Sequence, residues 1–428
     1  MSNDASAKGA TKSLASLPEM RFSDFSDGRG WRTLPLSKVL RPVSREVAKP
    51  ATQYTGLGLR SHGKGTFHKP DQDPKKIAMD HLYVVHAGDL IVNITFAWEG
   101  AIAVADYDDE GCLVSHRFPT YEFKANVSTP DFFRHVIARR AFVYKLGVIS
   151  PGGAGRNRVM NKKDFLRLSI SLPSLDEQNK ISAILSSLDE LIEAESEIIQ
   201  SLEDQKIGLM QNLFPASGQA VPALRFAEFR KNGDWTETTI GKLGKFHYGK
   251  SAPKWSLADD APTKCVRYGE LYSRFGTIIS ETYSRTTIEP EKLRFSKGGE
   301  ILVPRVGEKP EDFGKCCCYL PLPNVAIGEM ISVFQTVEDS LFYTYYFRHL
   351  YRDFAKVVEG QNVKNLYYAN LEPIQIFRPD LAEQKKIAGV LSSIDAILDA
   401  HIERRATLDA QKAGLLQRLL PDPSEVQP

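Results

Sequence analysis

The sequence predicts an α+β protein in which two mixed α/β globular bodies are separated by two long coiled-coil helices, with an internal pseudo-twofold repeat. Three observations lead to this fold class. A helical segment occurs twice, a short aromatic segment ahead of each body occurs twice, and the two bodies between these repeats differ. The expected divisions are a loose tail at 1–19, a first body at 20–173, a first helix at 174–214, a linker at 215–223, a second body at 224–378, a second helix at 379–421 and a tail at 422–428.

The aromatic segment comes first along the chain. Residues 20–31, MRFSDFSDGRGW, match residues 224–235, LRFAEFRKNGDW, at an offset of 204, with Arg, Phe, Phe and Trp in common. Each copy opens a body of about 140 residues with mixed texture. LYVVHAGDLIVNITF and GGEILVPRVG predict strands, and LRLSISLP and LEPIQIFRP predict closing strands. PDFFRHVIARRAFVYKLG and SLFYTYYFRHLYRDFAKVV predict amphipathic helices.

The helical repeat is the strongest signal. Residues 173–215 and 379–421 align at an offset of 206 and are identical at 20 of 43 positions. Apolar residues recur at steps of three, four and seven, which is heptad spacing. About 41 residues would form a rod of roughly 60 Å, and two copies could bury each other's apolar stripes. The expected helix seam is Ile181, Leu185, Leu188, Ile192, Leu202, Leu209, Ile387, Leu391, Ile394, Leu398, Leu408 and Leu415.

Polar residues of the helices carry further expectations. Ser174 and Asp380 are expected N-caps, and Glu177 and Glu383 follow three residues later, a spacing typical of a capping box. The centre of the pseudo-twofold falls near Glu195 and His401, where we expect a charged pair that fixes the register. Residues 174–214 hold nine acids against two bases, which favours docking of a protein and not of phosphates.

Composition narrows the class of protein. Apolar content is 42% and charged content 25%, typical of a soluble globular chain, and no apolar run is long enough to span a membrane. The polar start is not a secretory signal. Cys112, Cys265 and the run 316–318 lack metal-ligand spacing, so we expect free thiols in a reducing cytoplasm, with the run in a strand. We expect no metal and no cofactor in this chain.

Basic residues gather in glycine-rich segments of the bodies. Net charge is only +2, yet residues 32–80 hold ten Lys and Arg against four acids. Basic side chains flanked by glycine can approach phosphates and groove edges, and Arg and Asn read guanine and adenine with paired hydrogen bonds. A solvated surface loop is the alternative for each, and Trp255 could equally lie in the core. The candidate DNA-binding residues are Arg60, His62, Lys64, Lys69, Arg156, Asn157, Arg158, Lys250, Lys254, Arg305, Lys309, Asn362, Lys364 and Asn365.

Catalytic motifs are missing from the sequence. GLGLRSHGKGTF lacks the spacing of a phosphate-binding P-loop, and no Asn/Asp-Pro-Pro-aromatic tetrapeptide is present to hold a flipped base. No glycine turn suits S-adenosylmethionine. PDLAEQKK superficially resembles a nuclease carboxylate–lysine set, but its acids fall on the first turn of a helix, where they cap it. We therefore expect no catalytic residues in this chain.

These segments together resemble a known family, the DNA-specificity subunit of type I restriction–modification systems. The resemblance covers about residues 20–421 and rests on RFxxFxxxxxW, GDLIVN and GGEILV, and above all on LPSLDEQNKI…SSLDELI and RPDLAEQKKI…SSIDAIL. It implies two target-recognition domains that each read half of a bipartite site in double-stranded DNA, and an antiparallel pair of long helices that sets the gap and docks two methyltransferase subunits. It also implies two methyltransferase subunits and motor-nuclease subunits as partners, which would carry S-adenosylmethionine, ATP and Mg.

Two alternatives stay open. A coiled-coil adaptor could bind proteins at both ends without any role in DNA binding, although the contrast of basic loops and acidic helix argues against it. A specificity subunit could also serve a methylation-only system that has no nuclease, and the sequence does not separate these two.

Overall fold

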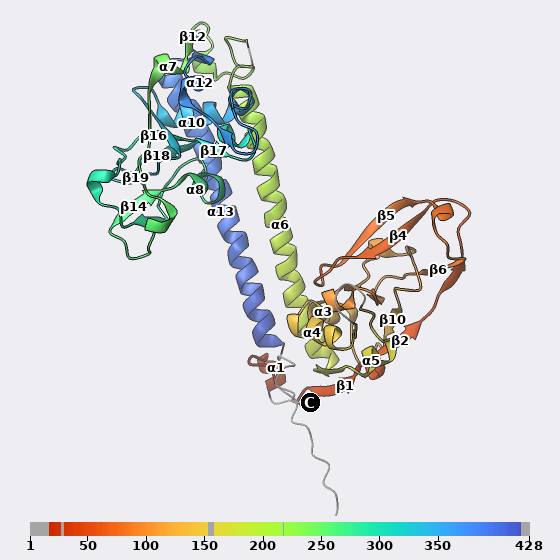
Figure 1. Ribbon diagram of the computed structural model, residues 1–428. Helices are drawn as coiled ribbons and strands as arrows, with labels where there is room; N and C mark the ends of the chain where they lie inside the picture. Colours follow the sequence, from red (N-terminus) through yellow and green to blue (C-terminus); the bar gives the residue numbers. More distant parts are fainter. Residues whose placement is uncertain (1–16, 27–29, 153–157, 217, 421–428) are drawn as a thin grey trace, which may run out of the picture. The chain divides into compact units, whose positions relative to one another are not determined.

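The computed structural model describes residues 17–26, 30–152, 158–216 and 218–420 (Figure 1). The chain divides into two compact units: unit 1 is residues 1–194 and 405–428, and unit 2 is residues 195–404. Two helices of 39 residues each, α6 (Leu175–Leu213) and α13 (Leu381–Leu419), run from one unit into the other. Each unit therefore consists of one globular body, the beginning of one long helix and the end of the other. Within the described ranges, no helix is long and apolar enough to cross a membrane.

Unit 1 places its strands in three sheets. Their orders are β1-β11, β2-β10-β7-β8 and β3-β6-β9-β4-β5. The elements are α1 (Ser23–Ser26), β1 (Arg32–Pro35), α2 (Leu36–Val39), β2 (Leu40–Val43), β3 (Glu46–Ala48), β4 (Tyr54–Leu59), β5 (Thr66–Gln72), η1 (Pro74–Lys76), β6 (His81–Val84), β7 (Leu90–Val92), η2 (Ala97–Glu99), β8 (Ile102–Val104), η3 (Tyr107–Asp109), β9 (Leu113–Val114), β10 (Thr120–Phe123), α3 (Pro130–Ile137), α4 (Arg140–Val148), α5 (Lys162–Arg167) and β11 (Ser169–Leu172).

Unit 2 places its strands in four sheets. Their orders are β12-β22, β13-β20-β16-β18, β15-β14-β19 and β17-β21. The elements are η4 (Ala227–Phe229), β12 (Thr236–Thr239), α7 (Ile240–Leu243), β13 (Gly244–Tyr248), η5 (Lys254–Ser256), β14 (Thr263–Val266), α8 (Tyr268–Ser273), β15 (Ser284–Thr286), η6 (Pro290–Lys292), β16 (Glu300–Pro304), β17 (Val306–Gly307), α9 (Asp312–Lys315), β18 (Cys318–Leu320), β19 (Ala326–Ile327), β20 (Ile331–Thr336), α10 (Ser340–His349), α11 (Tyr351–Lys356), β21 (Lys364–Asn365), α12 (Tyr368–Leu371) and β22 (Gln375–Arg378).

The repeat of the sequence is also a repeat of the fold. The four-stranded sheets of the two units have the same order, with β2, β10, β7 and β8 answering to β13, β20, β16 and β18. The closing strands pair antiparallel with the strand after the aromatic segment at equivalent register, Arg32 with Leu172 in unit 1 and Thr236 with Arg378 in unit 2. The two closing strands and the internal repeat were predicted from the sequence, and the structure contains both.

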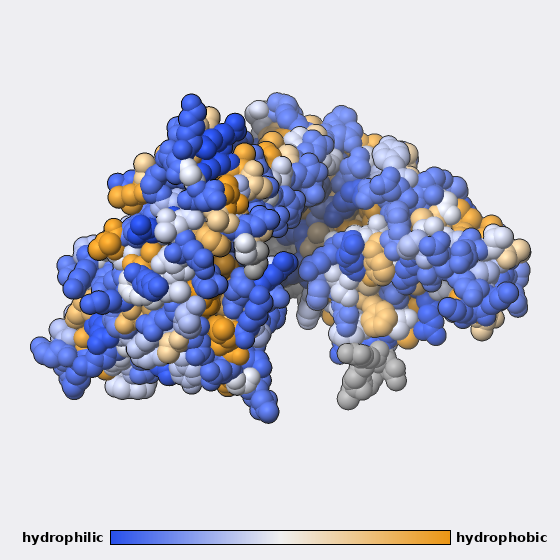
Figure 2. All heavy atoms as spheres, turned by 90° about the horizontal axis from the view of Figure 1, so that it is seen from above, coloured by the Kyte–Doolittle hydropathy of each residue, from blue (hydrophilic) through white to orange (hydrophobic). Residues whose placement is uncertain are grey.

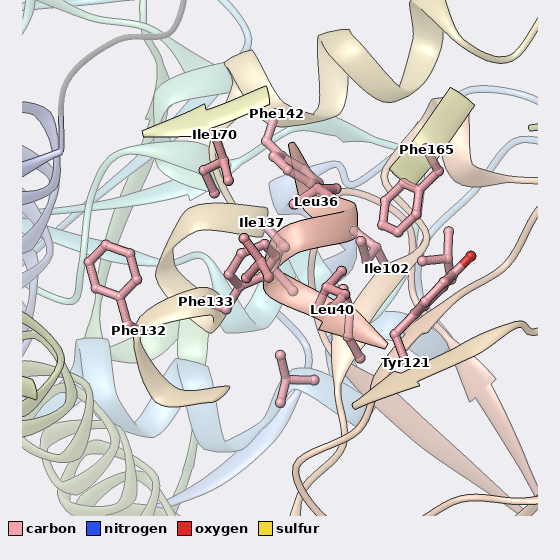
Figure 3. Packing of buried hydrophobic residues seen from close by; sticks show 14 of the residues in the cluster. Leu36, Leu40, Ile102, Tyr121, Phe132, Phe133, Ile137, Phe142, Phe165 and Ile170 are labelled. Atoms are coloured by element: carbon pink, nitrogen blue, oxygen red, sulfur yellow. The ribbon is translucent and has the colours of Figure 1, made fainter. Parts of the chain in front are cut away.

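The core of each body includes both long helices. In unit 1 the beginning of α6 supplies Ile181 and Leu185 to a cluster with Trp31 and Phe132, and Leu420 from beyond α13 joins the same cluster. Figure 3 shows part of this core, where Leu36, Phe133, Phe142, Phe165 and Ile170 converge from several elements. In unit 2 the equivalent residues Ile387, Leu391 and Phe214 are buried together with Trp235 and Phe342. Because burying such side chains stabilises by about 1.5–3 kcal/mol each, each body depends on the helix segments that pack against it.

Several expectations are corrected. Only Cys318 of the cysteine run lies in a strand, because α9 ends at Lys315 and Cys316 and Cys317 form the turn between them. Each amphipathic segment breaks into two helices, α3 with α4 and α10 with α11. Two residues of the expected tail make contacts, since Pro18 is buried and Glu19 forms an ion pair with Arg418, and residues 1–16 lie outside the described ranges. All five cysteines are free, as expected.

Candidate nucleic-acid interface

An ion pair anchors the aromatic segment of each body to its long helix. The guanidinium of Arg21 binds both carboxylate oxygens of Glu177, at 2.8 and 2.7 Å, and Arg225 binds Glu383 at 2.8 Å on each oxygen. Both carboxylates are 1% exposed. In each expected capping box, therefore, only one of the two hydrogen bonds is as predicted. Ser174 and Asp380 do accept the backbone N–H of Glu177 and Glu383, but the two glutamates turn to the arginines.

A buried glutamine joins each long helix to the body that precedes it. The amide nitrogen of Gln178 donates to the carbonyl oxygens of Val127 and Pro173, and its amide oxygen accepts the backbone N–H of Thr129, the N-cap of α3. Gln384 makes the equivalent bonds in unit 2, to Pro379 and Asp339. Both glutamines are fully buried. Since buried polar groups cost free energy unless they are hydrogen-bonded, this amide fixes the angle at which the body meets the helix.

The two long helices are joined within each unit by a lysine–aspartate pair. Lys206 of α6 binds Asp395 of α13 in unit 2, and Lys412 of α13 binds Asp189 of α6 in unit 1. These pairs are equivalent at the offset of 206. Burial lowers the pKa of Lys206, an effect that Asp395 opposes. The helix of the body adds a third group: Tyr345 donates to Asp395 at 2.7 Å in unit 2.

The third group differs in unit 1. His135 occupies the position of Tyr345, and its Nε2 is buried without a hydrogen-bond partner among the described residues. Burial lowers the pKa of His135, and Asp189 opposes that effect.

The contact expected between Glu195 and His401 at the centre of the helices is present, inside unit 2. Nδ1 of His401 lies 2.6 Å from a carboxylate oxygen of Glu195, and Nε of Arg404 lies 3.1 Å from the other oxygen. The Glu195 side chain is 6% exposed. In unit 2, Glu195 faces 401–404 while Lys206 faces Asp395, so the helices run antiparallel there. The residues of the expected seam are all buried or half-buried.

In unit 1 the first group of candidate cations lies in the β4–β5 hairpin. The guanidinium of Arg60 and the ammonium of Lys69 both lie over the Phe67 ring, at 5.7 and 5.3 Å from its centroid. His62 has a left-handed backbone with φ of 65° and donates its N–H to the carbonyl of Glu99 at 2.7 Å. Lys64 is exposed at the tip of this loop. Left-handed backbone in a residue other than glycine is uncommon and is held here by the segment 97–100.

The same segment reaches the second candidate group of unit 1. The Arg158 guanidinium lies over the Trp98 ring, with its central carbon 5.4 Å from the ring centroid. The structure thus connects the 58–69 loop and Arg158 through the short helix η2. The candidates Arg156 and Asn157 lie outside the described residues.

In unit 2 the candidates gather around Arg305. Its guanidinium carbon lies 4.6 Å from the centroid of the Tyr248 ring and 5.6 Å from that of Tyr367. Burial raises the pKa of the Tyr248 phenol, and Arg305 opposes the effect. β17 and β21 pair next to Arg305 and bring Lys364 and Asn365 to the same place. Asn365 also donates its side-chain N–H to the Val363 carbonyl.

The remaining candidates of unit 2 lie around this cluster on exposed turns. Lys250 is exposed, and the two residues after it, Ser251 and Ala252, have φ of 62° and 60°. The exposed Lys254 lines a shallow pocket with Val306, the neighbour of Arg305. Lys309 and Asn362 are exposed. Trp255, for which the sequence left core and surface open, is 79% exposed.

The candidate sites of both units combine hydrogen-bond donors of Arg and Lys with aromatic rings. Hydrophilic side chains cover most of the face seen in Figure 2, and apolar groups are scattered among them. In the part of the chain that the structure describes, no three His, Cys, Asp or Glu side chains come together as a metal site. Stacked arginines with lysines around them suit phosphates and base edges.

The sequence did not indicate the rings beneath the arginines. Trp98, Tyr248 and Tyr367 contact Arg158 and Arg305 across the fold. Tyr248 and Tyr367 stood in segments singled out for their polar and basic residues, whereas Trp98 did not. One signal was present. The segments 152–164 and 360–372 both begin with glycine and both precede a closing strand, and each holds one member of an arginine–ring pair.

Comparison with known proteins agrees with this geometry. The family model described as the type I restriction modification DNA specificity domain matches residues 77–204 and 232–409. The MjaVIII specificity subunit of a type I restriction enzyme from Methanocaldococcus jannaschii is 25% identical over 271 residues, 61% of this chain and 63% of that protein. The HindI specificity subunit from Haemophilus influenzae is 23% identical over 187 residues, 43% of this chain and 40% of that one. The chain thus matches less than two thirds of the length of either relative.

A solved structure shares the fold. The crystal structure of the S subunit of a type I restriction–modification system from M. genitalium superimposes with a TM-score of 0.61 at 14% identity. The match covers 95% of this chain and 100% of that one.

Proposed function

The chain belongs to the type I restriction modification DNA specificity family, and we propose that it is the sequence-reading subunit of a type I restriction–modification complex. Each unit reads one half of a bipartite, asymmetric site in double-stranded DNA. The observation that carries this proposal is that the two units share the same attachment to the long helices but differ in the loops of their bodies. The anchoring pairs Arg21–Glu177 and Arg225–Glu383 are equivalent, whereas the cation-bearing loops that they support differ in sequence and fold.

The chemistry of the loops supports DNA as the ligand. Each unit places an arginine over one or two aromatic rings and also carries lysines on exposed turns. Lysines that bind phosphates supply affinity that depends on salt, and arginines that reach base edges supply sequence preference. We assign the first role to Lys64, Lys250 and Lys254, and the second to the stacked arginines.

The helices carry the second part of the proposal. α6 and α13 set the gap between the two half-sites, and their exposed faces dock two methyltransferase subunits. The acidic face of α6 supports this assignment, because it disfavours phosphates. Motor-nuclease subunits join for cleavage, and S-adenosylmethionine, ATP and Mg belong to these partners. We place the complex in the reducing cytoplasm, in keeping with the five free thiols. Residues 20–173 and 224–378 are the target-recognition domains.

One experiment separates this function from a protein adaptor. The purified chain, alone and with its methyltransferase partner, is titrated with random-sequence duplex DNA at several salt concentrations, and methylated adenines are then mapped. We expect no methyl transfer by the chain alone, and two unlike half-sites around a fixed gap for the complex. Methyl transfer by the single chain, a palindromic or continuous site, or binding that does not weaken with salt would contradict the proposal.

A further inference from the structure

Both units contain the same crossing of two chain segments. The first segment follows the central strand of the four-stranded sheet, and the second precedes the closing strand. In unit 1 the N–H of Met160 donates to the carbonyl of Ile94 at 2.8 Å, and in unit 2 the N–H of Leu366 donates to the carbonyl of Arg305 at 2.9 Å. Met160 and Leu366 are equivalent at the offset of 206. We name residues 93–99 with 158–160, and residues 304–307 with 364–367, the crossings of units 1 and 2.

Each crossing carries one arginine laid on an aromatic ring, but the two units take it from opposite segments. In unit 1 the second segment supplies Arg158, and the first supplies the ring of Trp98. In unit 2 the first segment supplies Arg305, and the second supplies the ring of Tyr367, with Tyr248 as a further ring. The bodies are otherwise dissimilar in sequence here. The same type of pair has thus been built twice, from different residues, at one position of the fold.

Neither arginine has a carboxylate partner in the described ranges, and Nε of Arg305 is buried without any hydrogen-bond partner there. Other arginines of the bodies behave differently, since Arg45 binds Asp89 and Glu122, and Arg134 binds Asp106. A guanidinium held over a ring is restrained in position and keeps its outer N–H donors available. Donors fixed in this way and left unpaired suit a ligand that offers two acceptors in one plane.

The surroundings of the two arginines suit a duplex. In unit 1 the left-handed loop at His62 is bonded to Glu99, beside Trp98. In unit 2 the left-handed pair Ser251 and Ala252 is bonded to the segment at 327–329, and Lys364 lies at the crossing itself. Strained backbone held by its neighbours is a common feature of binding sites. Each crossing therefore has cations beside it that could bind phosphates while the arginine reaches a base.

We propose that Arg158 and Arg305 are the specificity-determining residues of the two units, and that each reads a guanine through its O6 and N7 acceptors in the major groove. This inference rests on the proposed function and adds to it the residue and the base. It requires one guanine–cytosine pair in each half-site whose recognition depends on one arginine. The rings of Trp98, Tyr248 and Tyr367 are positioning groups that hold the guanidinium planes.

The test compares three conservative variants, each assembled as full chain with the methyltransferase partner. R305K and R158K keep the charge but lose the planar fork. R352K is the matched control, because Arg352 lies over Tyr351 at 5.4 Å on α11, outside either crossing. Methylation is measured on a duplex library that varies every position of both half-sites, and thermal unfolding is recorded for each variant.

We expect R305K to lower the preference for guanine at one position of one half-site by about 5- to 150-fold, and R158K to do the same in the other half-site. R352K should leave both half-sites unchanged. Unaltered half-sites in R305K and R158K would overturn the inference while the bipartite site of the wild type still supports the proposed function. A uniform loss over all sequences with a lowered unfolding temperature would also overturn it, since the stacked pairs would then be structural. A wild-type complex that reads no bipartite site would instead contradict the proposed function.

Discussion

Unit 1 and unit 2 differ in their outer sheets and agree in their inner ones. The inner sheets, β2-β10-β7-β8 and β13-β20-β16-β18, have the same order, and both pack on the beginning of one long helix and the end of the other. The outer sheet has five strands in unit 1, β3-β6-β9-β4-β5, and three in unit 2, β15-β14-β19. The part of each body that packs on the helices is therefore alike in the two units. The outer sheet, which does not share this packing, differs between them.

The two attachments are not identical in strength. The pair Lys206–Asp395 of unit 2 is 16% exposed on both side chains, but in the pair Lys412–Asp189 of unit 1 the aspartate is 47% exposed. Tyr345 donates to Asp395, whereas His135 leaves its Nε2 unpartnered in the described part of unit 1. Trp31 donates to Glu177 at 3.4 Å, while Nε1 of Trp235 is buried without a partner in the described part of unit 2. The frame is shared, and its polar contacts are distributed differently.

The largest effect should come from breaking one anchoring pair. Replacing Glu383 by Ala leaves Arg225 buried without its carboxylate, and removal of one partner of a buried pair costs about 3–5 kcal/mol. We expect that loss in the unfolding free energy, with faster hydrogen exchange confined to unit 2. E177A should do the same in unit 1. The control E228A removes an exposed ion pair with Lys386, so the unfolding free energy should fall by less than about 1 kcal/mol. If either variant accelerated hydrogen exchange equally in both units, the two anchoring pairs would not stabilise their units independently.

A second variant asks whether the helices keep the two readers apart. Seven residues that continue the heptad are inserted after Ser196 and after Ile402, close to the division between the units. A whole heptad preserves the seam, lengthens each helix by roughly 10 Å, and should widen the preferred gap by about three base pairs. Methylation at the original gap should fall by about 100-fold, as misplacement of reacting groups typically does.

Two results bear on that interpretation. Insertion into α6 alone displaces Lys206 from Asp395 and should impair assembly, whereas the double insertion should assemble. The preferred gap is read from duplexes that carry constant half-sites and every gap length. A gap that stays the same in a double variant that folds and assembles would show that the helices do not measure it.

What the sequence predicted follows from what is repeated in it. The two helices rest on residues that occur in both copies, so periodicity and alignment were enough to predict them. The closing strands followed from their apolar pattern, and the antiparallel pairing was implied by the family resemblance. The burial of Phe214 and Leu420 at the far ends of the helices was not predicted, because it depends on contacts with bodies distant along the chain. The reorientation of Glu177 toward Arg21 spans 156 residues and overrides a local capping pattern. The contact of Arg158 with Trp98 joins two segments that lie far apart along the chain, and neither periodicity nor alignment indicated that they would meet.

The two lysine–aspartate pairs differ in exposure, and breaking each of them should have an effect of intermediate size on the free energy of unfolding. D395A removes the ion pair of the buried Lys206 and the hydrogen bond of Tyr345 together, so we expect the unfolding free energy of unit 2 to fall by about 1.5–3 kcal/mol. D189A removes the more exposed pair with Lys412, and a loss of about 0.2–1 kcal/mol in unit 1 is expected. Denaturant unfolding with hydrogen exchange of α3 and α10 measures both. A larger loss for D189A would reverse the order that burial predicts.

The smallest effect concerns the pH dependence that His135 should give to unit 1. Burial lowers its pKa from the ordinary value of 6.5, with Asp189 and Asp131 opposing and Lys412 and Arg134 assisting. Below pH 6.5 the unfolded state therefore binds more protons at this site than the folded state. The stabilisation is complete above that pH and is lost as pH falls toward the lowered pKa.

H135Y places in unit 1 the residue type that unit 2 accommodates at Tyr345. We expect it to flatten the fall of unfolding free energy as pH drops below 6.5 by at most about 1.4 kcal/mol per pH unit, the limit for one proton. The reciprocal Y345H should add such a fall to unit 2, because it introduces a titratable ring at the same buried position. H116Q, at an exposed histidine, is the control and should leave the slope unchanged. The unfolding free energy is measured by denaturant titration across this range, with hydrogen exchange of α3 reporting unit 1. An unaltered slope in H135Y would show that His135 titrates in the folded protein as it does in the unfolded chain, so that its burial does not distinguish the two units.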